Sequence, residues 1–207
     1  MKAWNTQPSR DRVERTLAAL RANGIEATLA ATSTDAREMV LEMIPAGAEV
    51  YTMTSVTLDE MGLSREINDS GRYSGVRKAL FALDPKVQGR EQRKLGAAPD
   101  WALGSVHAVT ETGTLLIASR TGSQLPAYAF GAGTVIWVAG TQKIVKDVEE
   151  GLRRVEEYLV DRESARAREA YGLPAEFRTA PNKVLLINRE TQPGRARLIL
   201  VGEAVGL

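Results

Sequence analysis

Cysteine is absent from the 207 residues of this chain, and its absence excludes several kinds of chemistry. Without thiols the chain can form no disulfide, offer no thiolate nucleophile and supply no cysteine ligand to zinc or to an iron–sulfur cluster. Histidine occurs once, which excludes a metal site built from several histidines. We therefore expect no metal and no cofactor bound by this chain, and any redox centre has to come from a partner.

An excess of charge of one sign is also lacking. Lysine and arginine number 27, aspartate and glutamate 26, and the formal net charge is +1. Because basic and acidic residues are interleaved, long-range attraction to nucleic acid or to an anionic membrane should be weak. No run of about 18 uncharged apolar residues is present, and the first residues lack the apolar core of a secretory signal. The sequence predicts a cytoplasmic protein with no nucleic-acid partner and no membrane span.

The composition itself is that of a folded globular chain. Hydrophobic residues make up 43% and charged residues 26% of it, and no glycine-, proline- or glutamine-rich tract interrupts it. At this length a single domain over residues 1–207 is the simplest organisation.

The N-terminal quarter predicts alternating helices and strands. Ser9 can cap a helix that ends at Asn23-Gly24, and the alternation in IEATLAA then predicts a strand over 25–31. A second amphipathic helix follows TSTD, and AEVYTMT predicts another strand. The strand, helix and strand over 25–53 form a βαβ unit, which implies parallel pairing.

The middle of the chain predicts an α/β fold with a small antiparallel addition. Residues 57–98 suggest two or three short helices. WALG, HAVTE and TLLIAS predict strands, and Thr112-Gly113 forms a tight reversal that makes the last two antiparallel. TVIWVAG is typical of a strand buried on both faces, and the apolar spacing over 144–159 predicts a helix behind it.

The last quarter of the sequence has two notable features. The charged segment over 161–181 is interrupted by Pro174 and Pro181 and is the best candidate for a linker or flap. NKVLLIN and RARLILVG then predict two final strands joined by a Pro-Gly turn. These strands and the apolar helix over 144–159 can leave exposed surface, on which a homo-oligomer could form.

Hydroxyl side chains gather where the second strand ends. Thr54, Ser55 and Thr57 in TMTSVTLDE stand at its carboxyl end, where a helix begins. Ligands of parallel α/β sheets bind at this end, and hydroxyls with free backbone N–H groups suit a phosphate or a carboxylate. An ordinary helix cap with spare hydroxyls is the alternative.

Glu111 stands at the tip of the predicted hairpin, beside Gly113. From there a carboxylate can point into a cleft and act as a nucleophile or a general base, and it is our candidate catalytic residue. His107 lies four residues earlier, on the same face of an alternating strand. Thr112, Gly113 and Thr114 of the turn join the expected ligand site. A solvated glutamate and a structural histidine are the alternatives.

Three further residues complete the expected site. Ser123 and Gln124 in RTGSQLPAY have donors that can form an anion cradle, although a plain turn fits as well. Lys143 follows TVIWVAG at its carboxyl end and can face the same cleft as a cation, or it can face solvent. The glycines of GAGTVIWVAG precede a strand instead of following one, so they are no dinucleotide fingerprint.

At these residues the sequence resembles the lactate-utilisation (LUD) domain family. REQRKLGAAPDWALGSVHAVTETGTLLIASRTGSQLPAYAFGAGTVIWVAGTQKIVKDVEEGLRRV is similar to the family's central segment, and NKVLLIN with PGRARLILV resembles its closing hairpin. The resemblance extends to WNTQPS and to GAEVYTMTSVTLDEMG. It implies a NagB/RpiA/CoA transferase-like fold: a Rossmann-like parallel sheet sandwiched by helices, with a small antiparallel addition.

The resemblance also implies a function. Members of the family are associated with oxidation of L-lactate to pyruvate, together with sister proteins that carry iron–sulfur clusters. In CoA transferases of this fold the acyl-accepting glutamate precedes Asn-Gly, and here Glu111 precedes Thr112-Gly113. Three hypotheses follow: a lactate-utilisation protein that binds a small anionic metabolite, a non-catalytic assembly subunit for iron–sulfur partner proteins, and a stand-alone CoA-transferase-like or sugar-phosphate-isomerase-like enzyme.

Overall fold

A six-stranded parallel sheet forms the centre of the fold. A computed structural model describes residues 4–207. The strands stand in the order β1-β10-β7-β4-β2-β3, and each neighbouring pair is parallel. They are β1 (Glu26–Ala30), β2 (Glu49–Thr52), β3 (Ser74–Gly75), β4 (Trp101–Gly104), β7 (Thr134–Gly140) and β10 (Ala196–Val201). The predicted Rossmann-like parallel sheet is confirmed.

A second, four-stranded sheet lies beside the first, in the order β8-β5-β6-β9. Its strands are β5 (Ala108–Thr110), β6 (Leu115–Ser119), β8 (Ile144–Val145) and β9 (Lys183–Ile187). The hairpin expected at Thr112-Gly113 is present, with Ala108 opposite Leu116 in an antiparallel pair. Because β8 runs parallel to β5, the sheet is mixed instead of wholly antiparallel.

Eight α-helices surround the sheets in the part of the chain that the structure describes. They are α1 (Arg10–Ala22), α2 (Ser33–Met43), α3 (Val56–Glu60), α4 (Leu63–Asp69), α5 (Val76–Ala82), α6 (Gly89–Ala97), α7 (Val148–Arg154) and α8 (Val160–Tyr171). A π-helical turn over Val155–Leu159 joins α7 to α8, and another spans Ala127–Gly131. The segment 57–98 thus holds parts of four helices, more than the two or three expected.

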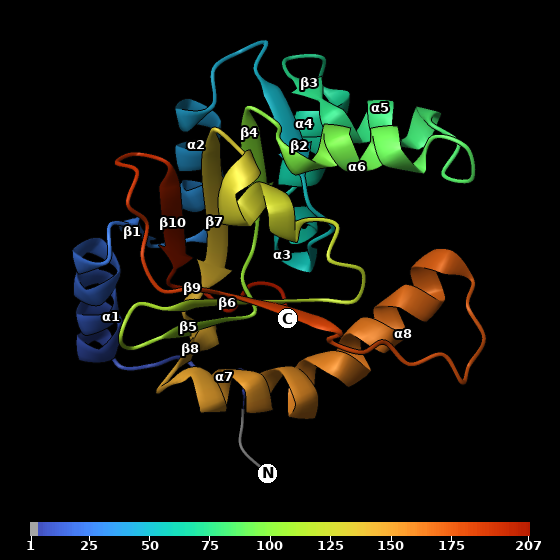
Figure 1. The fold of residues 1–207 in the computed structure, drawn as a ribbon. Coiled ribbons are helices and arrows are strands. Elements are labelled where there is room, and N and C mark those ends of the chain that lie inside the picture. Colours follow the sequence, from blue (N-terminus) through green and yellow to red (C-terminus); the bar gives the residue numbers. More distant parts are fainter. Residues whose placement is uncertain (1–3) are drawn as a thin grey trace.

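The small sheet is packed between the large sheet and α7 (Figure 1). Along β10, Leu198 and Leu200 join a core shared with α1 and the small sheet, whereas Ile199 and Val201 join a core shared with α2, α3 and α4. The opposite face of the small sheet packs on α7 and its π-helical turn. Side chains that alternate along each strand therefore build successive layers, as the period of two requires.

The predicted pairing of the first two strands is wrong. β1 and β2 lie in the same parallel sheet, but β10, β7 and β4 stand between them. The apolar runs of β7 and β10 are buried on both faces and fill the centre. In β1 only Ala27 and Ala30 are buried, and Leu29 is 46% exposed, so the predicted alternation in burial is not met; this exposure suits the edge of the sheet.

The two closing strands do not form a hairpin either. β9 pairs antiparallel with β6 in the small sheet, while β10 inserts between β1 and β7 in the large one. The turn between them carries the chain from one sheet to the other. Arg195 anchors this crossing, because its buried guanidinium binds Glu190 at 2.7 Å and the carbonyl oxygen of Ala132 at 3.0 Å.

The helix expected over 144–159 begins four residues later. Ile144 belongs to β8, and Asp147 caps α7 by accepting a hydrogen bond from the N–H of Glu150. Helical structure continues to Tyr171, so the predicted linker segment is half helix, and the loop follows Gly172.

Among the described residues, no helix has the length and apolar character needed to cross a bilayer.

Replacing Gly113 by alanine should destabilise the fold more than replacing Gly71. Both glycines have a positive φ, 82° and 78°, which costs an alanine about 1–2 kcal/mol. A Cβ at Gly113 would also lie 2.7 Å from the carbonyl carbon of Ala19 in α1, whereas one at Gly71 meets no atom within 4 Å. Urea unfolding of Gly113→Ala and Gly71→Ala measures the difference, and equal losses would contradict the packing of the hairpin on α1.

Candidate functional site

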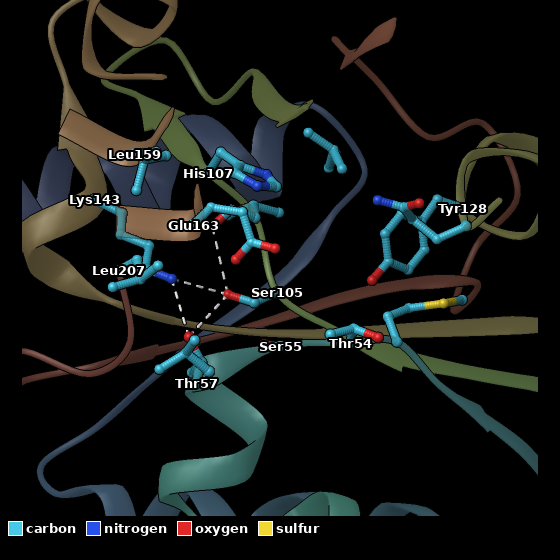
Figure 2. Close-up of a pocket in the computed structure, with 15 residues that line it drawn as sticks. Thr54, Ser55, Thr57, Ser105, His107, Tyr128, Lys143, Leu159, Glu163 and Leu207 are labelled. Atoms are coloured by element: carbon cyan, nitrogen blue, oxygen red, sulfur yellow. Dashed lines mark hydrogen bonds between the residues drawn. The ribbon is translucent and has the colours of Figure 1, made fainter. Parts of the chain in front are cut away.

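A pocket of about 90 Å³ lies at the carboxyl edge of the large sheet. The segments that follow β2, β4 and β7 all reach it, because parallel strands end on the same side. Figure 2 shows the side chains that line it. The lining residues are Met53, Thr54, Ser55, Val56, Thr57, Ser105, Val106, His107, Ile117, Gln124, Tyr128, Lys143, Leu159, Glu163 and Leu207.

Lys143 is the central cation of this pocket. Only 3% of the residue is exposed. Its Nζ donates to Thr57 Oγ1 at 3.0 Å and to Ser105 Oγ at 3.1 Å (Figure 2). Among residues 4–207 no carboxylate lies within ion-pair distance of Nζ. Burial lowers the pKa of Lys143 to about 7, the positive charge of Arg154 adds to this effect, and Glu60 opposes it.

Arg154 adds a second buried positive charge close to Lys143. The residue has no exposed surface, and its Nη1 donates to the carbonyl oxygen of His107 at 2.8 Å. Its Nε and Nη2 have no hydrogen-bond partner among the described residues. Burial lowers the pKa of Arg154 to about 10, so the guanidinium remains charged at neutral pH. Two buried cations without a paired acid create a positive potential that favours an anion.

His107 is neutral at neutral pH. Burial lowers the pKa of its ring to about 3, and the charges of Lys143 and Arg154 contribute. Its Nδ1 accepts a hydrogen bond from the N–H of Ala118 at 3.1 Å, which assigns the ring proton to Nε2. The imidazole can thus donate a hydrogen bond to a ligand oxygen but adds no charge.

The acid that lines the pocket is already paired. Both carboxylate oxygens of Glu163 bind Arg166, at 2.6 and 2.7 Å, in a bidentate pair. Tyr128 lines the opposite side, and burial raises its pKa, so the phenol stays protonated. Its hydroxyl approaches β4 so closely that a Cβ at Gly104 would overlap it. Gly104 is therefore needed for the tyrosine to reach the pocket.

The structure brings most of the predicted site residues together. Those that line the pocket are Thr54, Ser55, Thr57, His107, Gln124 and Lys143. Lys143 faces the pocket and not solvent. Ser55 also caps α3 by accepting from the N–H of Leu58, so it serves the ordinary capping role as well. Gln124 is held by the hydroxyl of Ser119 at 2.9 Å.

Glu111 does not join them. Its carboxylate binds Arg12 Nε of α1 at 2.7 Å, with Arg15 at 3.9 Å, and it lines none of the cavities described. The hairpin tip packs on α1, where Asn23 donates to the carbonyl oxygen of Thr112. The expectation that the hairpin acid and the hydroxyl loops border one hollow is therefore not met, because the hairpin tip packs on α1 and holds Glu111 outside the pocket.

The other residues of the turn also lie outside the pocket. Thr112 Oγ1 is hydrogen-bonded to Thr110 Oγ1 at 2.9 Å, and Thr114 Oγ1 donates to Asn188 Oδ1 at 3.1 Å. Gly113 packs on α1. Ser123 lines two neighbouring cavities instead, of about 300 and 580 Å³. The nearer one shares Met53, Thr54 and Gln124 with the pocket and extends it toward the exposed Phe81.

Comparison with known proteins identifies the family. A model of the LUD domain family matches residues 13–201. The chain belongs to the LUD domain family. Its fold is similar to the crystal structure of a DUF162 family protein from Deinococcus radiodurans, with a TM-score of 0.58 and 16% sequence identity over 94% of this chain and 99% of that one. No curated protein matches the sequence.

Sequence reasoning missed three polar residues that line the pocket, Ser105, Tyr128 and Glu163, and the buried Arg154 nearby. Ser105 directly follows β4, so the rule that pointed to Thr54 at the end of β2 also applies to it. The burial of Arg154 could not be predicted from the sequence. The apolar spacing over 144–159 predicts that Leu152, and not Arg154, lies on the buried side of the helix. In the structure Gly151 and Arg154 are buried there, and Leu152 is 39% exposed.

Within residues 4–207 no group of three or more histidine or acidic side chains is placed to hold a metal ion.

Replacing Lys143 by methionine should stabilise the fold, most strongly at low pH. The folded-state pKa of about 7 lies below the unfolded value of 10.5, so the unfolded state binds the proton more tightly. The penalty of burying the amine is therefore full below pH 7, declines between about pH 7 and 10.5, and vanishes above. Urea unfolding at pH 6.5 and pH 9 measures the gain of Lys143→Met over the wild type.

The control for that measurement is Lys146→Met. The Lys146 side chain is 80% exposed, so its removal should leave stability nearly unchanged at both pH values. A gain in Lys143→Met that is the same at pH 6.5 and pH 9 would show that Lys143 does not carry the lowered pKa.

Proposed function

We propose that this LUD domain protein binds a small carboxylate at the Lys143 pocket and serves in the oxidation of L-lactate to pyruvate. The observation that carries the proposal is the arrangement of Lys143, which has two hydroxyl partners, no paired carboxylate and a neighbouring buried arginine. An anionic ligand supplies the missing negative charge. Membership of the family, which is associated with lactate utilisation, supports lactate and pyruvate as the first ligands to test.

The protonated amine has one N–H to offer the ligand. An ammonium group has three N–H bonds, and two of them point to Thr57 and Ser105. The third is left for a carboxylate oxygen, in a charge-assisted hydrogen bond. His107, Gln124, Thr54 and Ser55 also line the pocket and offer further polar groups.

Electron transfer in this proposal belongs to partner proteins. Oxidation of lactate to pyruvate releases two electrons and two protons, and an acceptor has to take up the electrons. The chain contains no cysteine with which to hold an iron–sulfur cluster. We therefore propose iron–sulfur proteins as partners, while this chain binds and orients the acid.

Lactate and pyruvate should bind at pH 6 and bind less well to Lys143→Met. Loss of one hydrogen bond to a charged group costs about 1.5–3 kcal/mol, or roughly 10- to 100-fold in affinity. Isothermal titration calorimetry measures the dissociation constants, and lactamide tests whether the ligand charge is required. Affinity for lactate should fall as pH rises through the Lys143 pKa of about 7, because the third N–H is lost.

Glu111→Gln is the matched control. It removes a charge that binds Arg12 outside the pocket, so it should leave the affinity unchanged and cost at most about 1 kcal/mol of stability. Equal binding by the wild type and Lys143→Met would reject this pocket. A loss of binding confined to Glu111→Gln would instead move the site to the hairpin. If neither acid binds to any variant, the proposed function is wrong.

A further inference from the structure

We propose that Lys143 forms an imine with the C2 carbonyl of a 2-oxo acid bound in the pocket. This inference rests on the proposed function, because it takes the same pocket and the same class of acid. It goes further, since it makes Lys143 a nucleophile. It also predicts that oxo acids react with Lys143 whereas hydroxy acids only bind. Three features of the site carry it: the proton arrangement around Nζ, the charges that face it, and the shape of the pocket.

The proton arrangement leaves a lone pair of Nζ free. Thr57 Oγ1 donates to Ser105 Oγ at 3.3 Å, and Ser105 Oγ donates to the carbonyl oxygen of Val106 at 3.4 Å (Figure 2). Each hydroxyl has thus committed its single proton and can only accept from Nζ. A neutral amine has two N–H bonds, which these two acceptors satisfy. Its lone pair is then directed away from both hydroxyls.

The charges around the amine favour its neutral form. Arg154 of α7 is the cation that acts on it, and Glu60 of α3 is the opposing acid, whose carboxylate accepts from the N–H of Gly206. His107 is neutral, and Glu163 of α8 is paired with Arg166. With a pKa of about 7, a large share of Lys143 is unprotonated at neutral pH, whereas an exposed lysine titrates near 10.4.

Lys143 forms part of the wall of the pocket. Lys143 emerges from the turn after β7 with its chain buried, so Nζ is the part of the residue that meets the cavity of about 90 Å³. A short acid fits this volume. Arg154 provides a positive field for its carboxylate even when Lys143 is neutral, and hydroxyl and amide groups supply hydrogen bonds.

The reaction balances without an oxidant or a reductant. The Nζ lone pair adds to C2, and the carbonyl oxygen takes up a proton to give a carbinolamine. The C–O bond then breaks, both amine hydrogens leave with that oxygen as water, and a C=N bond remains. Lactate has a hydroxyl at C2 and cannot form this bond.

Borohydride trapping tests the inference. Wild-type protein incubated with pyruvate and sodium borohydride should gain the mass of pyruvic acid less one oxygen atom, and peptide mapping should place the label on Lys143. Lactate in place of pyruvate should give no label. Lys143→Arg should also give none, while Lys146→Arg, which changes the exposed lysine three residues away, should be labelled like the wild type. The labelling rate should rise between about pH 6 and pH 8.

Each outcome separates the inference from the proposed function. Calorimetric binding of both acids without a label on Lys143 overturns imine formation and leaves the carboxylate site intact. No binding and no label overturn both. Labelling spread over Lys143 and exposed lysines alike, or retained in Lys143→Arg, shows nonspecific reductive alkylation and also overturns the inference.

Discussion

The contact of Lys143 Nζ with the hydroxyls of Thr57 and Ser105 is the interaction on which the site depends. Its three members come from segments that follow β7, β2 and β4, which are far apart in the chain. They meet because β4 pairs in parallel with both β2 and β7, with Leu103 opposite both Thr52 and Ile136. Any fold that kept these strands but reversed one of them would carry its residue to the opposite edge. Parallel pairing is thus a requirement of the site and not only of the core.

The same contact places demands on the structure that surrounds it. A buried amine costs stability unless its N–H groups find partners, and Arg154 adds a second buried charge. The small sheet and α7 hold these groups: Gly151 lets α7 approach Leu116 and Ala108, and Arg154 reaches the carbonyl oxygen of His107 from there. Such a cost in the core is characteristic of a functional site, because packing alone would favour apolar residues at both positions.

Local patterns in the sequence predicted the elements well but not their order in space. The periods that produced α1, β1, α2 and β7 depend on neighbouring residues, whereas the place of β10 between β1 and β7 depends on which strands are apolar on both faces. The same holds for the site: residues whose position depends on local patterns could be predicted, and residues whose position depends on tertiary packing could not. The position of Thr54, Thr57 and Lys143 at this pocket could be predicted because they follow strand ends. Glu111 was misplaced because the direction of a hairpin tip is set by its packing on α1, and Arg154 was missed because a buried arginine breaks the apolar pattern.

The choice of hydroxyl partners, instead of a carboxylate, decides what Lys143 can do. A carboxylate beside Nζ would hold the proton, raise the pKa and neutralise the charge, so the amine would be a structural ion pair. Thr57 and Ser105 accept two hydrogen bonds and leave the third position of Nζ to the ligand. In the protonated state that position is an N–H for a carboxylate, and in the neutral state it is a lone pair for a carbonyl carbon. Because the pKa lies near 7, both states are populated under neutral conditions. In the function we propose, one nitrogen thus recognises the negative charge shared by hydroxy and oxo acids, and also the carbonyl group that distinguishes them.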